Sequence, residues 1–385
     1  MSDVRAERSG PTVAQFRADL CAWIETHLDE LRPPPSPAGD VVAELTHQRH
    51  VQAMLFDAGW MRWGWPPDAG GLGGSPLLRA VLGEELTSRA LVHTTSWSMH
   101  EVLGPAVLTY GRSDVVNALF PRLLRGDEFW CQGFSEPEAG SDLAGLRTTA
   151  RRTSSGWTVT GEKLWTSWGH HATRCVVLAR TGEASSRARG ISAFLVDMDT
   201  PGVSARPLRT MAEVDEFSAT SFVDVAVPAE RLLGEEGDGW ALAQRVLACE
   251  RGAIFWQRGA WLAHHLEVLV AQSTGRDAAA IGEAYQVLHA FRSRSWSTQH
   301  TLARDGVIGP EASVDKILVA QAEQAVFDAA RELLDGGLEL GDGDTADRWR
   351  REWAYSRAAT IYGGTSEIQK DIVSTRVLGL PRGAA

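Results

Sequence analysis

The sequence predicts an α+β fold in which helical and β segments are segregated along the chain. Apolar residues recur at helical spacing up to about residue 127, short runs of alternating apolar and polar residues follow, and helical spacing returns after Gly239. A chain that alternated strand and helix would instead indicate a parallel sheet. We therefore expect a helical domain at 1–127, an antiparallel β domain at 128–236 and a second helical domain at 237–385.

The first domain is expected to open with a helix capped by Thr12, because apolar residues follow it at three- and four-residue steps. The proline-rich run 32–37 ends this helix, since proline cannot continue one. The rest of the domain is expected to contain a helix at about 41–59, a loop rich in Gly and Pro at 63–74, and helices over about 75–125.

The middle domain shows the period-2 alternation and turn residues of β-strands, for example at 157–160, 175–179, 191–196 and 222–227. The last domain returns to Ala, Leu, Glu and Arg at helical spacing, and glycines interrupt it near 336 and 341. Helices are expected there over about 240–272, 278–302, 312–336 and 346–360.

Composition excludes several classes of protein. The 385 residues carry a formal net charge of −11, which disfavours binding to the phosphates of nucleic acid. No apolar run is long enough to span a membrane, and the first residues lead into no signal peptide. The four cysteines are scattered, as in proteins of a reducing cytosol. We expect a cytoplasmic protein that binds neither nucleic acid nor membrane.

Common catalytic motifs are absent from the sequence. It contains no Walker A loop, no HExxH and no GxSxG. It also has no CxxC, and its two His-His pairs are adjacent residues whose side chains point apart. We therefore expect no metal site.

Three segments, 130–146, 161–169 and 361–369, combine hydroxyl groups and free backbone amides with glycines and aromatic residues. Such a surface can hydrogen-bond the edge of a polar heterocycle while an indole covers its face. The alternative for each segment taken singly is a turn in which Ser and Gly serve the backbone conformation.

Taken together, the three segments resemble the acyl-CoA dehydrogenase family. The resemblance spans nearly the whole chain, from Ala58-Gly59-Trp60 to the terminal run 377–381. It implies an N-terminal helical domain, a central β domain and a C-terminal four-helix bundle. It also implies FAD bound between the β domain and the C-terminal helices, usually in a tetramer.

The resemblance assigns roles at matched positions. Ser135 would hydrogen-bond the pyrimidine edge of the flavin, Trp165 would pack beside the isoalloxazine ring, and Ser167 would lie within reach of flavin N5. Gly140 and Ser141 would also lie near the pantetheine arm of the substrate. The full set of expected FAD contacts is Phe134, Ser135, Gly140, Ser141, Trp165, Ser167, Arg276, Thr365 and Glu367, with Gln369 as a further candidate.

The chain departs from the family pattern at three places. Glu138 and Trp168 stand where smaller residues are usual, and each is expected to alter the pocket or its entrance. The family's Arg-x-Gln-Phe-Gly segment, which binds the FAD pyrophosphate, is absent in that form. Arg276 is its nearest counterpart, and the alternative for Arg276 is a solvated arginine at a helix start.

The catalytic base is expected at Glu250. Removal of a weakly acidic α-proton needs a base within hydrogen-bond reach. Many family members carry that Glu directly after the Tyr of the third segment, where this chain has Gly363. Other members carry it on a C-terminal helix just before an Arg, which matches Glu250-Arg251. Gly363 would still offer its N–H to the thioester carbonyl. The alternative for Glu250 is an exposed helix glutamate paired with a nearby arginine.

The resemblance implies FAD-dependent α,β-desaturation of an acyl-CoA, with Glu250, Arg251 and Gly363 as the catalytic residues. Electrons would pass to an electron-transferring flavoprotein, and the chain would form a homo-oligomer, a dimer or a tetramer. One alternative is a tailoring dehydrogenase or oxidase that acts on an acyl group bound to a carrier protein. Another is a non-catalytic subunit of a mixed tetramer.

Overall fold

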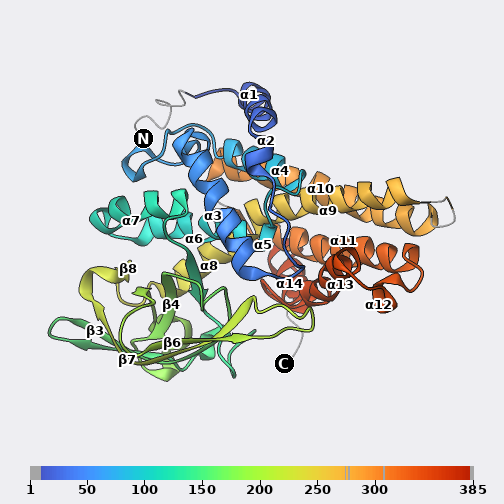
Figure 1. Cartoon of the computed structure of the whole chain (residues 1–385). Coiled ribbons are helices and arrows are strands. Elements are labelled where there is room, and N and C mark those ends of the chain that lie inside the picture. The colour runs from blue at the N-terminus through green and yellow to red at the C-terminus, as the bar shows by residue number, and fades with distance from the viewer. Residues whose placement is uncertain (1–9, 274, 276–277, 307, 382–385) are drawn as a thin grey trace.

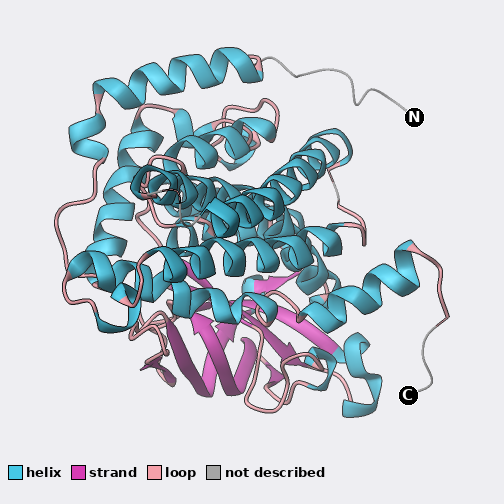
Figure 2. Ribbon diagram, turned by 90° about the vertical axis from the view of Figure 1, so that its right-hand side faces the viewer, coloured by secondary structure: helices cyan, strands magenta, loops and turns pink. Residues whose placement is uncertain are grey.

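The computed structural model describes residues 10–273, 275, 278–306 and 308–381. The helices from the two ends of the chain form one body, and the β domain lies against one side of it (Figures 1 and 2). Helix α4 of the first part packs against α9 of the last part, and α6 packs against α8. The two helical segments, far apart in sequence, are therefore neighbours in space.

The N-terminal part begins with a helix that carries a full capping box. The Thr12 hydroxyl accepts the Gln15 N–H, and the Gln15 side chain accepts the Thr12 N–H, so both exposed donors are satisfied. This is the cap that the sequence predicts. The helices are α1 (Val13–Thr26), α2 (Leu28–Leu31), α3 (Val41–Asp57), α4 (Leu77–Thr87), α5 (Thr94–Trp97), α6 (Met99–Tyr110) and α7 (Ser113–Arg125).

The middle part is one eight-stranded sheet with the path β6-β7-β3-β2-β4-β5-β8, and β1 pairs beside β4. Most neighbours are antiparallel, as expected, but β1 runs parallel to β4, with Cys131 opposite Cys175. The strands are β1 (Trp130–Gly133), β2 (Thr149–Thr153), β3 (Gly156–Ser167), β4 (Arg174–Arg180), β5 (Ile191–Asp197), β6 (Val203–Leu208), β7 (Phe217–Pro228) and β8 (Leu232–Leu233).

The C-terminal part is helical again, and a π-helical turn at Glu250–Ile254 interrupts its first long helix. Such turns are rare and occur often at functional sites. In the part of the chain that the structure describes, no helix is both long and apolar enough to cross a membrane. The helices are α8 (Gly239–Cys249), α9 (Phe255–Gln272), α10 (Ala278–Asp305), α11 (Ala312–Leu333), α12 (Gly337–Leu340), α13 (Asp344–Ser356) and α14 (Ser366–Ile372), with a second π turn at Val373–Val377.

The core has three apolar clusters. The largest joins the N-terminal helices to one face of the sheet and to α8, and it includes Phe16, Trp65, Trp130 and Leu242. A second fills the space among α9, α10, α11 and α13, and a third lies on the other face of the sheet. Because the first cluster spans all three parts of the chain, their mutual positions depend on a shared core.

A buried ion network also joins the helical parts. Arg258 of α9 donates to Glu323 of α11 at 2.6 Å and to Glu352 of α13 at 3.2 Å. It also donates to the Thr94 hydroxyl of α5 at 3.1 Å, and His93 lies 3.1 Å from Glu352. Although burial disfavours the ionised form, Arg258 and His93 hold the pKa of Glu352 well below its ordinary value. The charges are therefore retained and matched inside the protein.

Replacing Arg258 by methionine is expected to lower stability by about 3–5 kcal/mol, because two buried carboxylates would lose their partner. The measurement is the melting temperature by calorimetry at neutral pH. Arg348→Met is the control, since Arg348 forms an exposed pair with Asp344 at 3.0 Å and should leave the melting temperature nearly unchanged. Equal shifts in the two variants would contradict the assigned role of the network.

Candidate active site

The loop that follows β1 is pinned against β3. The Leu164 N–H donates to the Ser135 carbonyl at 2.9 Å, so Ser135 and Phe134 lie beside the end of β3. The buried ammonium of Lys163 donates to Glu136 at 2.8 Å and to the Phe134 carbonyl at 3.2 Å. Burial lowers the pKa of Lys163 to about 8, and Glu136 opposes that shift. The first two expected flavin contacts are thus held by a buried ion pair.

The rest of this loop reaches the surface. Glu136 accepts the backbone N–H groups of Arg147 at 2.6 Å and Thr148 at 2.9 Å, which closes the loop at its base. Gly140 and Ser141 lie exposed near its tip. Glu138, which we expected to alter substrate entry, forms an exposed ion pair with Arg147 at 2.5 Å. The loop is therefore closed at its base, while its tip is open to a ligand.

Trp165 is the most unusual of the expected cofactor contacts. Its side chain is 57% exposed although it is a large indole at the end of a strand, and its φ is +61°. One edge meets Phe217 at 5.9 Å between ring centroids. An exposed aromatic face of this kind favours a flat ligand that covers it.

Free hydroxyl groups stand near this indole. Within the described ranges, no protein group hydrogen-bonds the side-chain hydroxyls of Ser135 and Ser167, and the buried Thr166 hydroxyl also lacks a partner. A polar heterocycle over Trp165 could supply hydrogen-bond partners to the two serine hydroxyls, whereas the Thr166 hydroxyl is buried on the other side of the strand. These residues therefore fit FAD, in which the isoalloxazine ring is flat and carries a polar edge.

Trp168 does not act as the sequence led us to expect. It is fully buried in the largest apolar cluster and does not narrow an open pocket. The backbone N–H of Trp168 donates to the Glu216 carbonyl at 2.6 Å, which fixes the backbone just after Ser167. The physical reason is the burial of apolar surface, because the indole packs in the cluster that joins the N-terminal helices to the sheet.

The third segment forms a tight turn and a short helix. Thr365 caps α14 by accepting the Ile368 N–H at 3.3 Å, and Glu367 in its first turn is exposed. Gln369 is fully buried and donates to the carbonyls of Gly363 and Gly364, each at 3.3 Å. Gln369 therefore shapes the glycine turn, a role that the sequence analysis missed.

The two positions at which the family places a base meet in space. A Cβ built on Gly363 would lie 2.7 Å from Oε1 of Glu250 and 3.4 Å from Cε of Lys316. The φ of Gly363 is +62°, which also favours glycine. The Glu250 carboxylate therefore occupies the space that a side chain at 363 would fill.

The surroundings of Glu250 raise its basicity. Burial raises the pKa of the Glu250 carboxyl, while the nearby charges of Arg251 and Lys316 partly oppose that shift. Burial also lowers the pKa of Arg251, and its Nε lacks a hydrogen-bond partner. No described residue hydrogen-bonds the Glu250 carboxylate, so the carboxylate is free to accept a proton.

Lys316 contacts residues that lie just before the Gly363 turn. It is fully buried, donates to the Ala359 carbonyl and lies 4.6 Å from the centre of the Tyr362 ring. Burial lowers its pKa to about 8, and Glu323 and Glu250 oppose that shift. These contacts give Lys316 a structural role beside the Gly363 turn.

Tyr362 connects the Gly363 turn to the buried network around Arg258. Tyr362, next to Gly363, donates to Glu323 of the Arg258 network at 3.0 Å. Its ring lies 5.9 Å from that of Tyr355, whose pKa is raised by burial and by the charge of Glu216. Glu216 is the residue whose carbonyl accepts from Trp168. The hydrogen bond from Tyr362 therefore ties the Gly363 turn to the Arg258 network.

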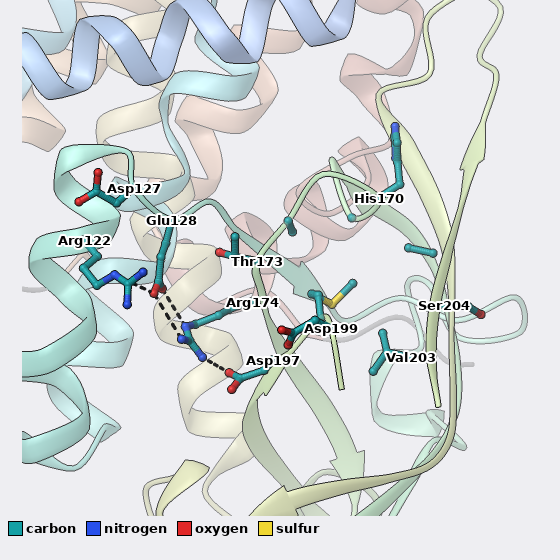
Figure 3. Close-up of a pocket in the computed structure, with 14 residues that line it drawn as sticks. Arg122, Asp127, Glu128, His170, Thr173, Arg174, Asp197, Asp199, Val203 and Ser204 are labelled. Carbon is teal, nitrogen blue, oxygen red and sulfur yellow. Dashed lines mark hydrogen bonds and ion pairs between the residues drawn. The ribbon is translucent and has the colours of Figure 1, made fainter. Parts of the chain in front are cut away.

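A cavity lined by charged residues lies apart from the expected site residues that the structure describes. Arg276 falls outside the described residues. A cavity of about 480 Å³ lies between α7 and the edge of the sheet, where Glu128 pairs with Arg122 and Arg174 (Figure 3). None of the expected site residues lines it. Its charges are largely matched by each other, so we assign it no function.

Glu250→Gln is expected to stabilise the fold increasingly as pH rises. Because the pKa of Glu250 is raised in the folded state, the unfolded chain loses this proton at lower pH than the folded chain. Wild-type stability should therefore fall above a pH of about 4.3, whereas glutamine cannot ionise. Melting temperatures of both proteins between about pH 4.5 and pH 8 provide the measurement. A difference that does not depend on pH would contradict the buried state of this carboxyl.

Comparisons with known proteins cover the whole chain. Residues 20–127 match the acyl-CoA dehydrogenase N-terminal domain, residues 131–225 the middle domain and residues 237–378 the C-terminal domain. Acyl-CoA dehydrogenase IpdE1 of Mycobacterium tuberculosis is 35% identical, over 97% of this chain and 99% of that protein. The human mitochondrial short-chain specific acyl-CoA dehydrogenase is 28% identical, over 81% of this chain and 78% of its own length.

Two solved structures share the fold throughout. The Tcur3481-Tcur3483 steroid ACAD superposes with a TM-score of 0.83 at 26% identity, covering 99% of this chain and 100% of that chain. The ChsE4-ChsE5 complex from Mycobacterium tuberculosis gives a TM-score of 0.80 at 26% identity, covering 98% and 100%. On these matches the chain belongs to the acyl-CoA dehydrogenase family of FAD-dependent oxidoreductases.

Proposed function

We propose that this enzyme desaturates an acyl-CoA thioester between its α and β carbons, with Glu250 as the base that removes the α-proton. The observation that carries this proposal is the position of the Glu250 carboxylate, 2.7 Å from where a side chain at 363 would begin. A buried carboxyl with a raised pKa is a stronger base than an exposed one, which suits this step.

The protein groups around Glu250 would stabilise the negative charge that develops on the thioester oxygen. We assign the Gly363 N–H as a donor to that carbonyl, since a preorganised backbone donor stabilises developing negative charge. Gln369 fixes the turn by holding the carbonyls of Gly363 and Gly364. Arg251 and Lys316 add positive charge nearby. Bound FAD supplies the acceptor for the β-hydride.

The cofactor contacts remain part of the proposal. Trp165, Phe134, Ser135 and Ser167 would hold the flavin ring, while Thr365 and Glu367 would lie toward the rest of FAD. Support comes from the exposed indole of Trp165 and from the free hydroxyls beside it. Gly140 and Ser141, at the open tip of the loop, would meet both the flavin and the pantetheine arm.

The proposal extends to the substrate carrier, the partners and the assembly. A CoA thioester is favoured over a carrier-protein thioester because the relatives at 35% identity are named acyl-CoA dehydrogenases. We propose an electron-transferring flavoprotein as electron acceptor, a homo-oligomer as the assembly, and domain limits at 127/128 and 236/237.

A mixed oligomer is the second candidate assembly. Two solved structures at 26% identity are named as pairs of components, Tcur3481-Tcur3483 and ChsE4-ChsE5. Glu250 argues against a non-catalytic role for this chain within such an assembly, because the buried carboxylate is retained although it costs stability. Mass measurement of the purified chain, alone and with candidate partner chains, distinguishes the assemblies.

Trp165→Ala is expected to weaken FAD retention at least about tenfold, because the flavin would lose the aromatic surface that covers it. Trp165→Phe should retain most of the binding. The visible flavin absorbance that stays with the protein through gel filtration gives the measurement. Because Trp165 is exposed, neither variant opens a cavity in the core. Equal flavin content in both would contradict the assignment.

Glu250→Ala is expected to reduce flavin bleaching by an acyl-CoA by about 10²–10⁴-fold, the usual contribution of a general base. Adding Gly363→Glu to Glu250→Ala should recover at least about tenfold of that loss, because the new carboxylate enters the same space. Anaerobic single-turnover bleaching provides both rates. Unchanged bleaching in Glu250→Ala at full flavin content would refute Glu250 as the base.

A further inference from the structure

A second group of buried ionisable side chains lies near Glu250 and has no part in the chemistry described above. It consists of Arg79 on α4 and His100 and Glu101 on α6. Glu101 and His100 are each only 3% exposed, and the Arg79 side chain is 12% exposed. Three ionisable groups have therefore been removed from water together.

This cluster lies beside the residue that precedes the base. Both α4 and α6 pack against the π turn that begins at Glu250. Cys249 is the residue that directly precedes Glu250. Burial raises the pKa of its thiol to about 11, and the charges of Arg245, Arg79 and Glu101 act on it. The helices that carry the cluster therefore pack against the turn that carries the base.

The pairing within the cluster is incomplete. The distance from Arg79 Nε to Glu101 Oε2 is 3.4 Å, and that Nε is buried without a hydrogen-bond partner. Among the described residues, none donates a hydrogen bond to the Glu101 carboxylate. His100 lies 3.8 Å from it, and burial lowers the pKa of His100 to about 3, so the imidazole is neutral.

The Arg258 network in the same protein shows what a structural ion pair looks like. Arg258 makes three hydrogen bonds to two carboxylates and a hydroxyl. A buried ion pair with no such bonds costs stability, because desolvation exceeds the attraction between the charges. Without a ligand, the Arg79–Glu101 pair therefore contributes little to the stability of the fold. Its unsatisfied hydrogen-bonding groups indicate that a ligand binds there.

The chemistry of the two groups specifies the ligand. Arg79 Nε–H lacks an acceptor and the Glu101 carboxylate lacks a donor, so a hydroxyl, which both accepts and donates, satisfies them together. A ketone offers no donor to Glu101, a carboxylate would be repelled by it, and a hydrocarbon leaves both groups unpaired. Arg79 is held in place by stacking on Trp65, 3.7 Å from the ring centre.

We propose that Arg79 and Glu101 form a subsite for a hydroxyl group on the acyl portion of the substrate. The inference rests on the proposed acyl thioester desaturation, and it names the class of acyl group that this chain accepts. Preference for a hydroxylated acyl group arises because an unsubstituted one would leave a buried donor and a buried carboxylate unsatisfied.

The test compares octanoyl-CoA with isomers that carry one hydroxyl at successive carbons of the distal half of the chain. Binding is measured by calorimetry on the FAD-loaded Glu250→Gln protein, in which turnover is blocked. At least one hydroxylated isomer should bind about tenfold or more tightly than octanoyl-CoA. In the same background, Arg79→Met combined with Glu101→Leu should bring the two affinities within about twofold.

Arg17→Met is the matched control, since it breaks ion pairs with Glu84 and Glu85 on the same helix but on the face toward α1. It should leave the ratio of affinities unchanged. If the double variant fails to fold, Glu101→Gln, which keeps the shape and an acceptor oxygen, replaces it and should reduce the ratio. A Glu250→Gln protein that binds all isomers no better than octanoyl-CoA overturns the subsite.

Turnover separates failure of the subsite from failure of the proposed function. With wild-type enzyme, bleaching of the flavin by octanoyl-CoA and by every hydroxylated isomer at equal kcat/KM would overturn the subsite and retain desaturation. Selective binding of a hydroxylated isomer without bleaching by any thioester would retain the subsite and contradict desaturation. Absence of binding by every thioester would overturn both.

Discussion

The arrangement of the helices depends on the buried guanidinium of Arg258. It ties α9 to α11 through Glu323, to α13 through Glu352 and to the N-terminal part through Thr94. A charge that is removed from water must keep its partners, because leaving one carboxylate unpaired costs several kcal/mol. The helices are therefore unable to slide past one another without breaking a matched set of bonds. Apolar packing alone tolerates such slippage more readily.

That constraint reaches the active site through one residue. Tyr362 bonds to Glu323 and directly precedes the Gly363 turn, so the ion network sets where the turn lies. Gln369 and Lys316 then fix the turn from its two sides. The π turn presents Glu250 to the same place. The distance between the carboxylate and Gly363 thus follows from contacts that lie mostly outside the reacting groups.

The fold could be read from the sequence where local patterns decide structure. The Thr12 cap, the helical spacing and the alternation of the middle domain all appear as expected, since each depends on neighbours in the chain. The parallel pairing of β1 with β4 could not be predicted, because alternation carries no information on strand direction. The π turn was also missed, since the residues from Leu247 to Ala253 have the composition of a continuous helix.

The candidate site also has features that the sequence could predict and features that it could not. The segments that resemble the family could be recognised by their residues, and the choice of Glu250 followed from finding glycine at 363. The roles of Gln369, Glu216 and the Arg79–Glu101 pair required distances between residues far apart in sequence. The burial of Trp168 depends on packing against residues far away in the sequence, which the local pattern does not reveal.

Two kinds of buried charge therefore coexist in this protein, and they differ in how completely they are bonded. Arg258 is paired with Glu323 and with Glu352, and it holds the helices in place. Glu250 and the Arg79–Glu101 pair have open hydrogen-bonding capacity, and they weaken the fold that contains them. Sites of this kind persist only where the surrounding structure is stable enough to carry the cost. The stability that the Arg258 network provides thus allows Glu250 and the Arg79–Glu101 pair to stay incompletely hydrogen-bonded. A bound substrate can then contribute the missing hydrogen-bond partners.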